Sequence, residues 1–324
     1  MNFTADCHFQ NSYHVEEVSV FILSTTKAYS LSLLVLFCAV NIAATVLSLF
    51  GNAVVFLTVA CSSELHITSN IGLASFALAN FFEGLFIHGL SVVLSVVTLQ
   101  GGCSLSGITR FLPLYLANVS VYSSLLNLVL VTLERYIGVI YSLRYHAILH
   151  QQRFVKVIAA VWITSFLLSV LNLVDTAAEI SRNTMTVVFS LSLTVAFCCS
   201  VKIYRVSKRQ RQQVAAQASA IRRTTEENQQ LRFRGARTMF YILVTLVICF
   251  VPALMVRILL KASAEAKNFT SLTLARPWAA VFFGMYTCVS PYVYFFRSQE
   301  LRRYSKKLLR RALGHLTLEF FSSR

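Results

Sequence analysis

Glu134, Arg135 and Tyr136 end a long apolar stretch of the chain that begins near Ser106. An arginine at the edge of the hydrocarbon layer is costly unless it is paired or reaches water, and the adjacent Glu134 offers it a carboxylate partner. These residue types therefore allow an ion pair to be made and broken at a membrane boundary. The sequence leaves two interpretations open at this point, a functional site and an ordinary interfacial anchor.

Catalytic chemistry has no comparable signal in the sequence. The chain has no metal-ligand spacing, no nucleophile paired with a base and no phosphate-binding loop. We therefore expect no enzyme activity, no metal and no cofactor.

The elements that must position Arg135 are membrane helices. The chain has 324 residues, of which 56% are hydrophobic and 13% charged, whereas a soluble protein typically carries about 25% charged residues. Seven apolar stretches are long enough to cross a bilayer, which takes about 20 residues each. They cover residues 30–60, 71–99, 106–131, 155–173, 184–203, 239–260 and 278–296. We predict an all-α membrane protein, a bundle of seven transmembrane helices with a short amphipathic C-terminal helix.

The placement of basic residues predicts the orientation in the membrane. The net charge is +16, and most of the 29 Lys and Arg residues fall on the side that holds Arg135. Excess Lys and Arg stays cytoplasmic, so we expect a multi-pass plasma-membrane protein with its N-terminus outside and its C-terminus inside. A nucleic-acid-binding protein would show a similar net charge without this distribution, and we expect no nucleic-acid partner. Residues 1–28 are then extracellular, residues 29–297 form the transmembrane domain and residues 298–324 form a cytoplasmic tail.

Two kinds of covalent site are expected on the outer side. Asn2 and Asn268 each begin an Asn-Phe-Thr sequence, which is an acceptor for N-linked glycans. Cys7 and Cys103 are the two cysteines of the sequence that clearly face the oxidising side. A bridge between them and two free thiols both remain open.

Five further motifs follow one another along the predicted helices. They are Gly51-Asn52-Ala53-Val54-Val55, Leu78-Ala79-Asn80, Trp162, Cys249-Phe250-Val251-Pro252 and Ser290-Pro291-Tyr292-Val293-Tyr294. Together with Glu134-Arg135-Tyr136 at the end of the third helix, they make the chain resemble the rhodopsin-like (class A) G-protein-coupled receptors. Each motif is weak alone, and their order gives the resemblance its strength.

The second internal loop narrows the resemblance to one branch. Leu143-Arg144-Tyr145-His146 is similar to a segment of melanocortin-like receptors. Arg110 stands where most of the family has a cysteine, and helix five has no proline. Both features also agree with cannabinoid and lysophospholipid receptors. Melanocortin itself is a poor candidate ligand, because the matching positions lack the acidic residues that bind it; they are Leu90, Arg110 and Leu114.

The resemblance implies a mechanism. A proline kinks a membrane helix, and Pro252 and Pro291 are the candidate hinges, although static kinks are the alternative. Ligand binding would swing the inner half of helix six outward and free Arg135 to engage a heterotrimeric G protein. Tyr204 and Tyr294 would support the open state.

Several residues depart from the family pattern in the core that would transmit this change. Asn80 and Ser290 replace residues that bind sodium, so a sodium-regulated inactive state is not expected. Phe250 replaces a tryptophan, and Asn52 keeps its usual position. Arg232 stands where an acidic partner of Arg135 is found, so we expect basal activity.

Glu83 is the unusual residue of helix two. It lies three positions after Asn80, on the same helical face. It could compensate for the missing acid, or it could simply be protonated and hydrogen-bonded. His88, higher on the helix, is interpreted as a satisfied polar side chain.

The ligand region is described mainly by exclusion. Ala117 stands where receptors for biogenic amines have an aspartate, and Gly284 stands where opsins have the retinal lysine. Apolar walls with two cations suit a lipid-like acid or an anionic peptide end, although both arginines could instead contact lipid headgroups. The candidate pocket residues are Arg110, Leu114, Ala117, Asn118, Val121, Arg257, Phe283 and Tyr286.

The tail has an amphipathic pattern. Leu301, Tyr304, Leu308 and Ala312 recur at helical spacing opposite a series of lysines and arginines, which predicts a helix on the inner membrane face in contact with lipids.

The alternative to a receptor is a channel or transporter that uses Glu83, His88 and Arg110.

Overall fold

The computed structural model describes residues 31–99, 108–171, 178–217, 244–245, 247–249, 251, 255–256, 259 and 269–322. The long helices are α2 (Leu31–Ala60), α3 (Thr68–Glu83), α4 (Leu90–Leu99), α5 (Ile108–Ile140), α7 (Gln151–Val170), α8 (Ala178–Gln217), α10 (Phe269–Arg297) and α11 (Gln299–Ser322). A π-helical segment, η2 (Gly84–Gly89), joins α3 to α4. The described residues also include three short helices: η1 (Ser63–Leu65), η3 (Ser142–Arg144) and α6 (Tyr145–Ile148).

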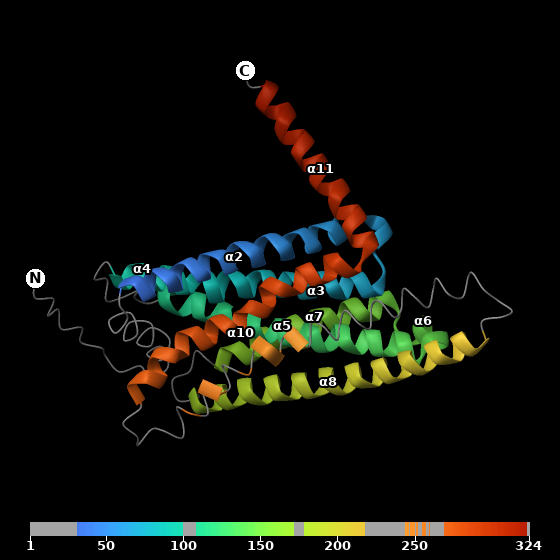
Figure 1. The fold of residues 1–324 in the computed structure, drawn as a ribbon, viewed down its shortest axis with the longest axis horizontal. Coiled ribbons are helices and arrows are strands. Elements are labelled where there is room, and N and C mark those ends of the chain that lie inside the picture. The colour runs from blue at the N-terminus through green and yellow to red at the C-terminus, as the bar shows by residue number, and fades with distance from the viewer. Residues whose placement is uncertain are drawn as a thin grey trace, which may run out of the picture.

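The long helices other than α11 run along one axis and form a bundle (Figure 1). Six spans in the described residues are long and apolar enough to cross a membrane: Leu31–Ala60, Thr68–Val97, Tyr115–Ile140, Gln151–Val170, Asn183–Arg209 and Pro277–Phe296. Most of the predicted stretch 239–260 lies outside the described residues, and the parts of it that are described are helical. The predicted all-α, seven-helix fold is confirmed.

α5 is the central helix of the bundle. It contacts α3, α7 and α8, and a larger share of its span is buried than of any other described span. It continues to Ile140, past the predicted end at residue 131, because Val139 and Ile140 still find apolar partners around Ile203 of α8. Glu134 and Arg135 consequently lie within the last turns of a helix.

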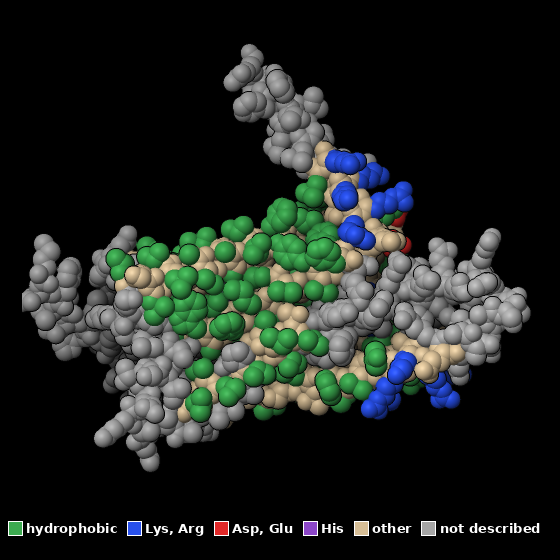
Figure 2. Space-filling view, viewed as in Figure 1, with side chains coloured by type: hydrophobic (Ala, Val, Ile, Leu, Met, Phe, Trp, Pro, Cys, Tyr) green, Lys and Arg blue, Asp and Glu red, His purple; other side chains and the backbone are tan. Residues whose placement is uncertain are grey.

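Lipid-facing and bundle-facing residues differ in kind. Leu36, Leu47 and Phe50 of α2 are exposed, and apolar side chains cover much of the bundle surface in Figure 2.

Small residues sit where helices approach closely, as is usual in membranes. A Cβ on Gly51 would lie 2.6 Å from Cγ of Pro291. Helix contacts in the bundle therefore depend on small side chains and on polar bonds between helices.

α11 leaves the bundle at the end where α8 also terminates (Figure 1). Its Leu301 and Ser305 are buried against the bundle, and Tyr304 and Leu308 are half-buried. Lys and Arg side chains gather on this helix and on the far end of α8 (Figure 2). The predicted amphipathic C-terminal helix is confirmed.

Candidate functional site

The ion pair at the end of α5 forms as the sequence predicts. Nε of Arg135 lies 3.4 Å from Oε2 of Glu134, and the side chains are 27% and 3% exposed. The carboxylate is therefore shielded, and the arginine side chain is partly exposed although its Nε is buried. It is the single salt bridge between described residues. An arrangement of this kind can release the arginine to another partner.

Tyr145 holds the second oxygen of the same carboxylate. Its hydroxyl donates to Oε1 of Glu134 at 2.7 Å. Burial, and next the negative charge of Glu134, raises the pKa of Tyr145 well above its ordinary value, so the hydroxyl stays a donor. Spacing along the chain does not predict this role of Tyr145, although Leu143-Arg144-Tyr145-His146 is similar to a family segment.

The tyrosines of the predicted switch lie in different surroundings. Tyr136 packs against Val139 and Ile203, and Nζ of Lys202 lies 5.7 Å from the centroid of its ring. Tyr294 is buried, and its ring centroid lies 6.4 Å from that of Phe76. It is also close enough to Arg135 to feel the charge of the guanidinium. Tyr204 is 55% exposed on α8. The structure thus brings Tyr294 near Arg135 within the core and leaves Tyr204 at the surface.

Pro291 creates an acceptor in the core. Proline has no N–H, so the carbonyl four residues earlier, that of Thr287, is free of its helical bond. Nδ2 of Asn52 donates to this carbonyl at 3.0 Å, and the Ser290 hydroxyl lies 3.4 Å from it. Asn52 thereby ties α2 to the kinked part of α10.

Asn80 joins three helices. Its Nδ2 donates to the Ser290 hydroxyl at 3.1 Å, and its Oδ1 accepts from the Ser124 hydroxyl at 2.7 Å. All three residues are buried. A neutral amide thus fills the place of the missing acid by bonding α3 to α5 and α10.

Glu83 continues this network toward the outer half of the bundle. Its Oε2 lies within hydrogen-bond distance, 2.5 Å, of the Tyr286 hydroxyl. Tyr286 also contacts the Ser124 hydroxyl. Glu83, Tyr286 and Ser124 are essentially inaccessible to solvent. The network agrees with the expectation that Glu83 and Asn80 share a helical face. Asn80 contacts Ser124 directly, and Glu83 contacts Tyr286, which in turn contacts Ser124.

His88 is bonded, as expected of a buried polar side chain. Its Nδ1 lies 2.9 Å from Oδ1 of Asn41, which can only accept, so Nδ1 is the protonated nitrogen. The ring rests on Gly284: a Cβ there would lie 2.5 Å from Nε2 of His88. Position 284, which holds lysine in opsins, is therefore glycine in this chain because the His88 ring fills the space that a side chain would need.

Trp162 makes a bond that the sequence analysis did not predict. Its Nε1 donates to the Ser75 hydroxyl at 3.1 Å, and Ser75 donates to Oδ1 of Asn127 at 2.8 Å. This chain of bonds connects α7, α3 and α5. The position of Trp162 in the motif series was the available signal.

Part of the predicted ligand pocket is tightly packed. Val121 and Phe283 form a cluster with Phe189 of α8, and the ring centroids of Phe189 and Phe283 are 5.9 Å apart. Ala117 is buried and Asn118 half-buried. Tyr286 contacts Glu83, so it faces the polar network as well as Phe283.

Other predicted residues lie outside what the structure describes. Arg110 and Leu114 are placed on α5, but their side chains are not described. Asn2, Cys7, Cys103, Arg232, Phe250, Pro252, Arg257 and Asn268 are not among the described residues.

The described part of the chain defines a multi-pass helical membrane protein with a buried polar network that leads toward an ion pair at one end. The family model described as "7 transmembrane receptor (rhodopsin family)" matches residues 51–186. This match runs from α2 into α8, so this part of the chain is similar to the rhodopsin family of seven-transmembrane receptors. The motifs of Asn80, Glu134-Arg135-Tyr136 and Trp162 fall inside the matched range, and those of helices six and seven fall outside it.

Proposed function

We propose that the chain is a plasma-membrane receptor that converts binding of an extracellular ligand into activation of a heterotrimeric G protein. The observation that carries the proposal is the Glu134–Arg135 pair, with its buried carboxylate and its partly exposed arginine side chain. In this proposal the N-terminus is outside and the C-terminus inside, in agreement with the cations gathered at the α11 end of the bundle (Figure 2).

Activation in this proposal is the transfer of Arg135 from one partner to another. Glu134 is held by Tyr145 as well as by Arg135, so the carboxylate keeps one bond when the arginine leaves. The ligand favours the open state only to the extent that it binds this state better.

The test is nucleotide exchange on purified G proteins by the receptor reconstituted in lipid nanodiscs. Arg135→Ala should abolish receptor-dependent exchange, because the group that engages the G protein is lost. Arg144→Ala is the matched control, since Arg144 is an exposed arginine of the adjacent loop, and it should retain most of the activity. Equal exchange by the Arg135→Ala variant would contradict the proposal, and ligand-free ionic currents would favour the channel.

Basal activity is part of the proposal. Among the described residues, Arg135 has an ion pair with Glu134 alone, and this neighbour lies on the same helix. A restraint within one helix does not tie α5 to helix six. Ligand-free exchange above that of empty nanodiscs is the expected result.

The ligand class proposed is a lipid-like acid or an anionic peptide end, as in the melanocortin, cannabinoid and lysophospholipid branch. Support comes from the apolar and aromatic character of Val121, Phe189 and Phe283, together with the predicted cations Arg110 and Arg257. A screen of lipids and peptides in the exchange assay tests this proposal.

Two covalent features are proposed for the outer side. N-linked glycans on Asn2 and Asn268 would be removed by glycosidase with a drop in mass. A Cys7–Cys103 bridge would protect both thiols from alkylation until reduction.

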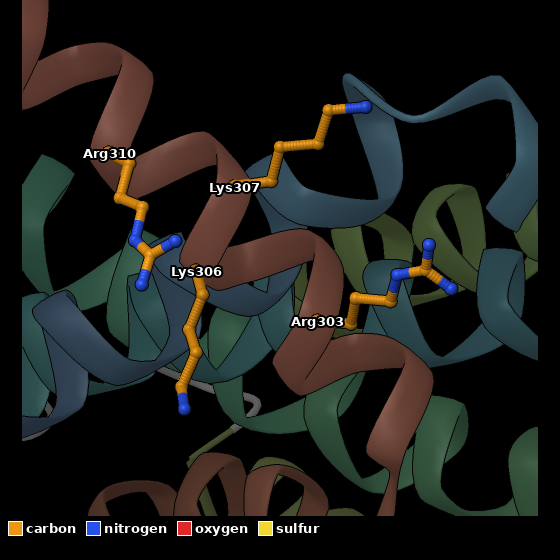
Figure 3. A pocket seen from close by; sticks show the side chains of 4 residues that line it. All are labelled: Arg303, Lys306, Lys307 and Arg310. Carbon is orange, nitrogen blue, oxygen red and sulfur yellow. The ribbon is translucent and has the colours of Figure 1, made fainter.

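Membrane lipids are proposed partners of α11. Arg303, Lys306, Lys307 and Arg310 recur at positions i, i+3, i+4 and i+7 and line one hollow (Figure 3). The buried Leu301 and Ser305 lie on the opposite side of the helix. An amphipathic helix with these two faces suits an anionic membrane surface.

Charge removal on α11 tests the lipid contact. Replacing Lys306 and Lys307 by glutamine should weaken capture of a fluorescent anionic lipid by about tenfold, because each basic residue near an anionic surface contributes attraction. The same change at Lys208 and Arg209 of α8 is the matched control and should have a smaller effect. The difference should shrink at high salt, and equal binding by the two variants would contradict the assignment to α11.

A further inference from the structure

Among the described residues, Glu83 is a buried carboxyl group without a lysine or arginine beside it. Its side chain is fully buried, and no described lysine or arginine forms a salt bridge with it. Its Oε1 has no hydrogen-bond partner among the described residues, and its Oε2 contacts Tyr286. An ionised carboxylate in such a place would carry a large desolvation cost.

A count of protons along the polar network gives an independent argument. Oε2 of Glu83, the Tyr286 hydroxyl, the Ser124 hydroxyl and Oδ1 of Asn80 form three successive contacts. Each contact needs one proton, and the two hydroxyl groups supply two. Oδ1 of Asn80 is a carbonyl oxygen and can only accept. With the Asn80 amide in this orientation, the third proton comes from the carboxyl group at the other end.

We propose that Glu83 is a proton-binding site and that it holds a proton in the packed bundle. The acid O–H then donates to Tyr286, Tyr286 donates to Ser124, and Ser124 donates to Asn80. Nδ2 of Asn80 donates onward to Ser290, whose hydroxyl lies 3.4 Å from the Thr287 carbonyl that Pro291 leaves free. Every bond of the chain then has one donor and one acceptor.

Loss of this proton would reverse the chain. An ionised Glu83 can only accept, so Tyr286 would have to donate to it and Ser124 would have to donate to Tyr286. The Asn80 amide would then turn, presenting Nδ2 to Ser124 and Oδ1 to Ser290. Proton binding at Glu83 thereby sets the direction of hydrogen bonds that end beside the Pro291 kink.

The functional consequence rests on the proposed receptor function. The packed state, with Arg135 on Glu134, binds the proton, whereas a state that admits water to Glu83 releases it. The packed state therefore binds more protons, and rising pH favours the other state. Ligand-free nucleotide exchange should increase with pH.

Other titratable groups near Glu83 could contribute to a pH response. Tyr286 and Cys288 of α10 act on it electrostatically, and His88 lies above it on the same span. Ser124 of α5 also faces the carboxyl group and does not titrate in this range. His88 is the group that titrates closest to neutral pH in its unperturbed form, so it needs a control of its own.

Infrared spectroscopy of the reconstituted receptor tests the proton directly. The wild type should show a carbonyl band of a protonated carboxylic acid at neutral pH that is lost in Glu83→Gln and kept in Glu64→Gln, since Glu64 is exposed. Tyr286→Phe should shift the band without removing it, because the acid loses its acceptor. Identical carboxyl bands in wild type and Glu83→Gln would overturn the proposal.

The coupling is tested by exchange rates from about pH 5 to about pH 8. We expect a rise of about tenfold in the wild type, little pH dependence in Glu83→Gln, and the wild-type slope in His88→Gln. A slope that survives in Glu83→Gln and vanishes in His88→Gln would overturn the coupling. Absence of exchange in every variant would contradict the receptor function instead, and the infrared band would still decide the protonation of Glu83.

Discussion

Replacing Glu134 by glutamine is expected to raise ligand-free nucleotide exchange by about tenfold. The substitution keeps the size of the side chain and removes the charge that holds Arg135 at 3.4 Å. A factor of ten corresponds to about 1.4 kcal/mol, which lies between the contribution of an exposed ion pair, up to about 1 kcal/mol, and the loss of about 3 to 5 kcal/mol when one partner of a buried pair is removed. The measurement is the initial rate of exchange without ligand, at matched amounts of reconstituted receptor.

Tyr145→Phe provides a graded version of the same experiment. It removes the donor to Oε1 of Glu134 and leaves the ion pair intact, so the expected increase is smaller than that of Glu134→Gln. Glu64→Gln is the control, because Glu64 is an exposed acid of the η1 loop. If both active variants matched the wild type while folding normally, Glu134 would not restrain Arg135.

The second large effect concerns stability. Gly284→Ala is expected to lower the free energy of unfolding by about 1 to 3 kcal/mol, the usual cost of overpacking. The new Cβ would lie 2.5 Å from Nε2 and 2.8 Å from Cε1 of His88. The ring cannot move away freely, because its Nδ1 is bonded to Asn41. Thermal unfolding in detergent would register the change as a lower melting temperature.

A double-mutant cycle identifies the cause of this loss. In a His88→Ala background the space above Gly284 is open, so Gly284→Ala should cost little or even stabilise the helix. Gly138→Ala is a matched control on α5, where the nearest atom of Tyr145 would be 3.5 Å away, and it should be close to neutral. A cost at Gly284 that persisted without the imidazole would show that His88 is not the obstacle.

The glycine at position 284 is explained by a residue that is distant from it in the sequence. The sequence excluded a retinal lysine there but offered no reason for glycine. The reason is the His88 ring, which comes from a residue almost two hundred positions earlier and is fixed by Asn41 of a third helix. Tyr145 and Glu134 are a second example: Tyr145 lies in α6, eleven positions after Glu134, and completes the site.

The sequence by itself determined the fold class and the approximate positions of the described spans, and it named the residues of the proposed switch. A membrane span must be a long apolar helix whose backbone hydrogen bonds are satisfied within the helix. The spans and the motif positions can therefore be identified from local runs of apolar residues and from the spacing of polar ones. The sequence also identified Asn52, Asn80, Glu83 and Ser290 as core polar residues.

Only the tertiary structure decided how these polar groups pair. Glu83 meets Tyr286, and Asn52 meets the carbonyl of Thr287, across more than two hundred residues. Spacing along a chain fixes which helix face a side chain occupies, and not which helix lies opposite. The partners are set by the packing of α2, α3, α5 and α10, where an unpaired polar group in the dry interior would be too costly to keep.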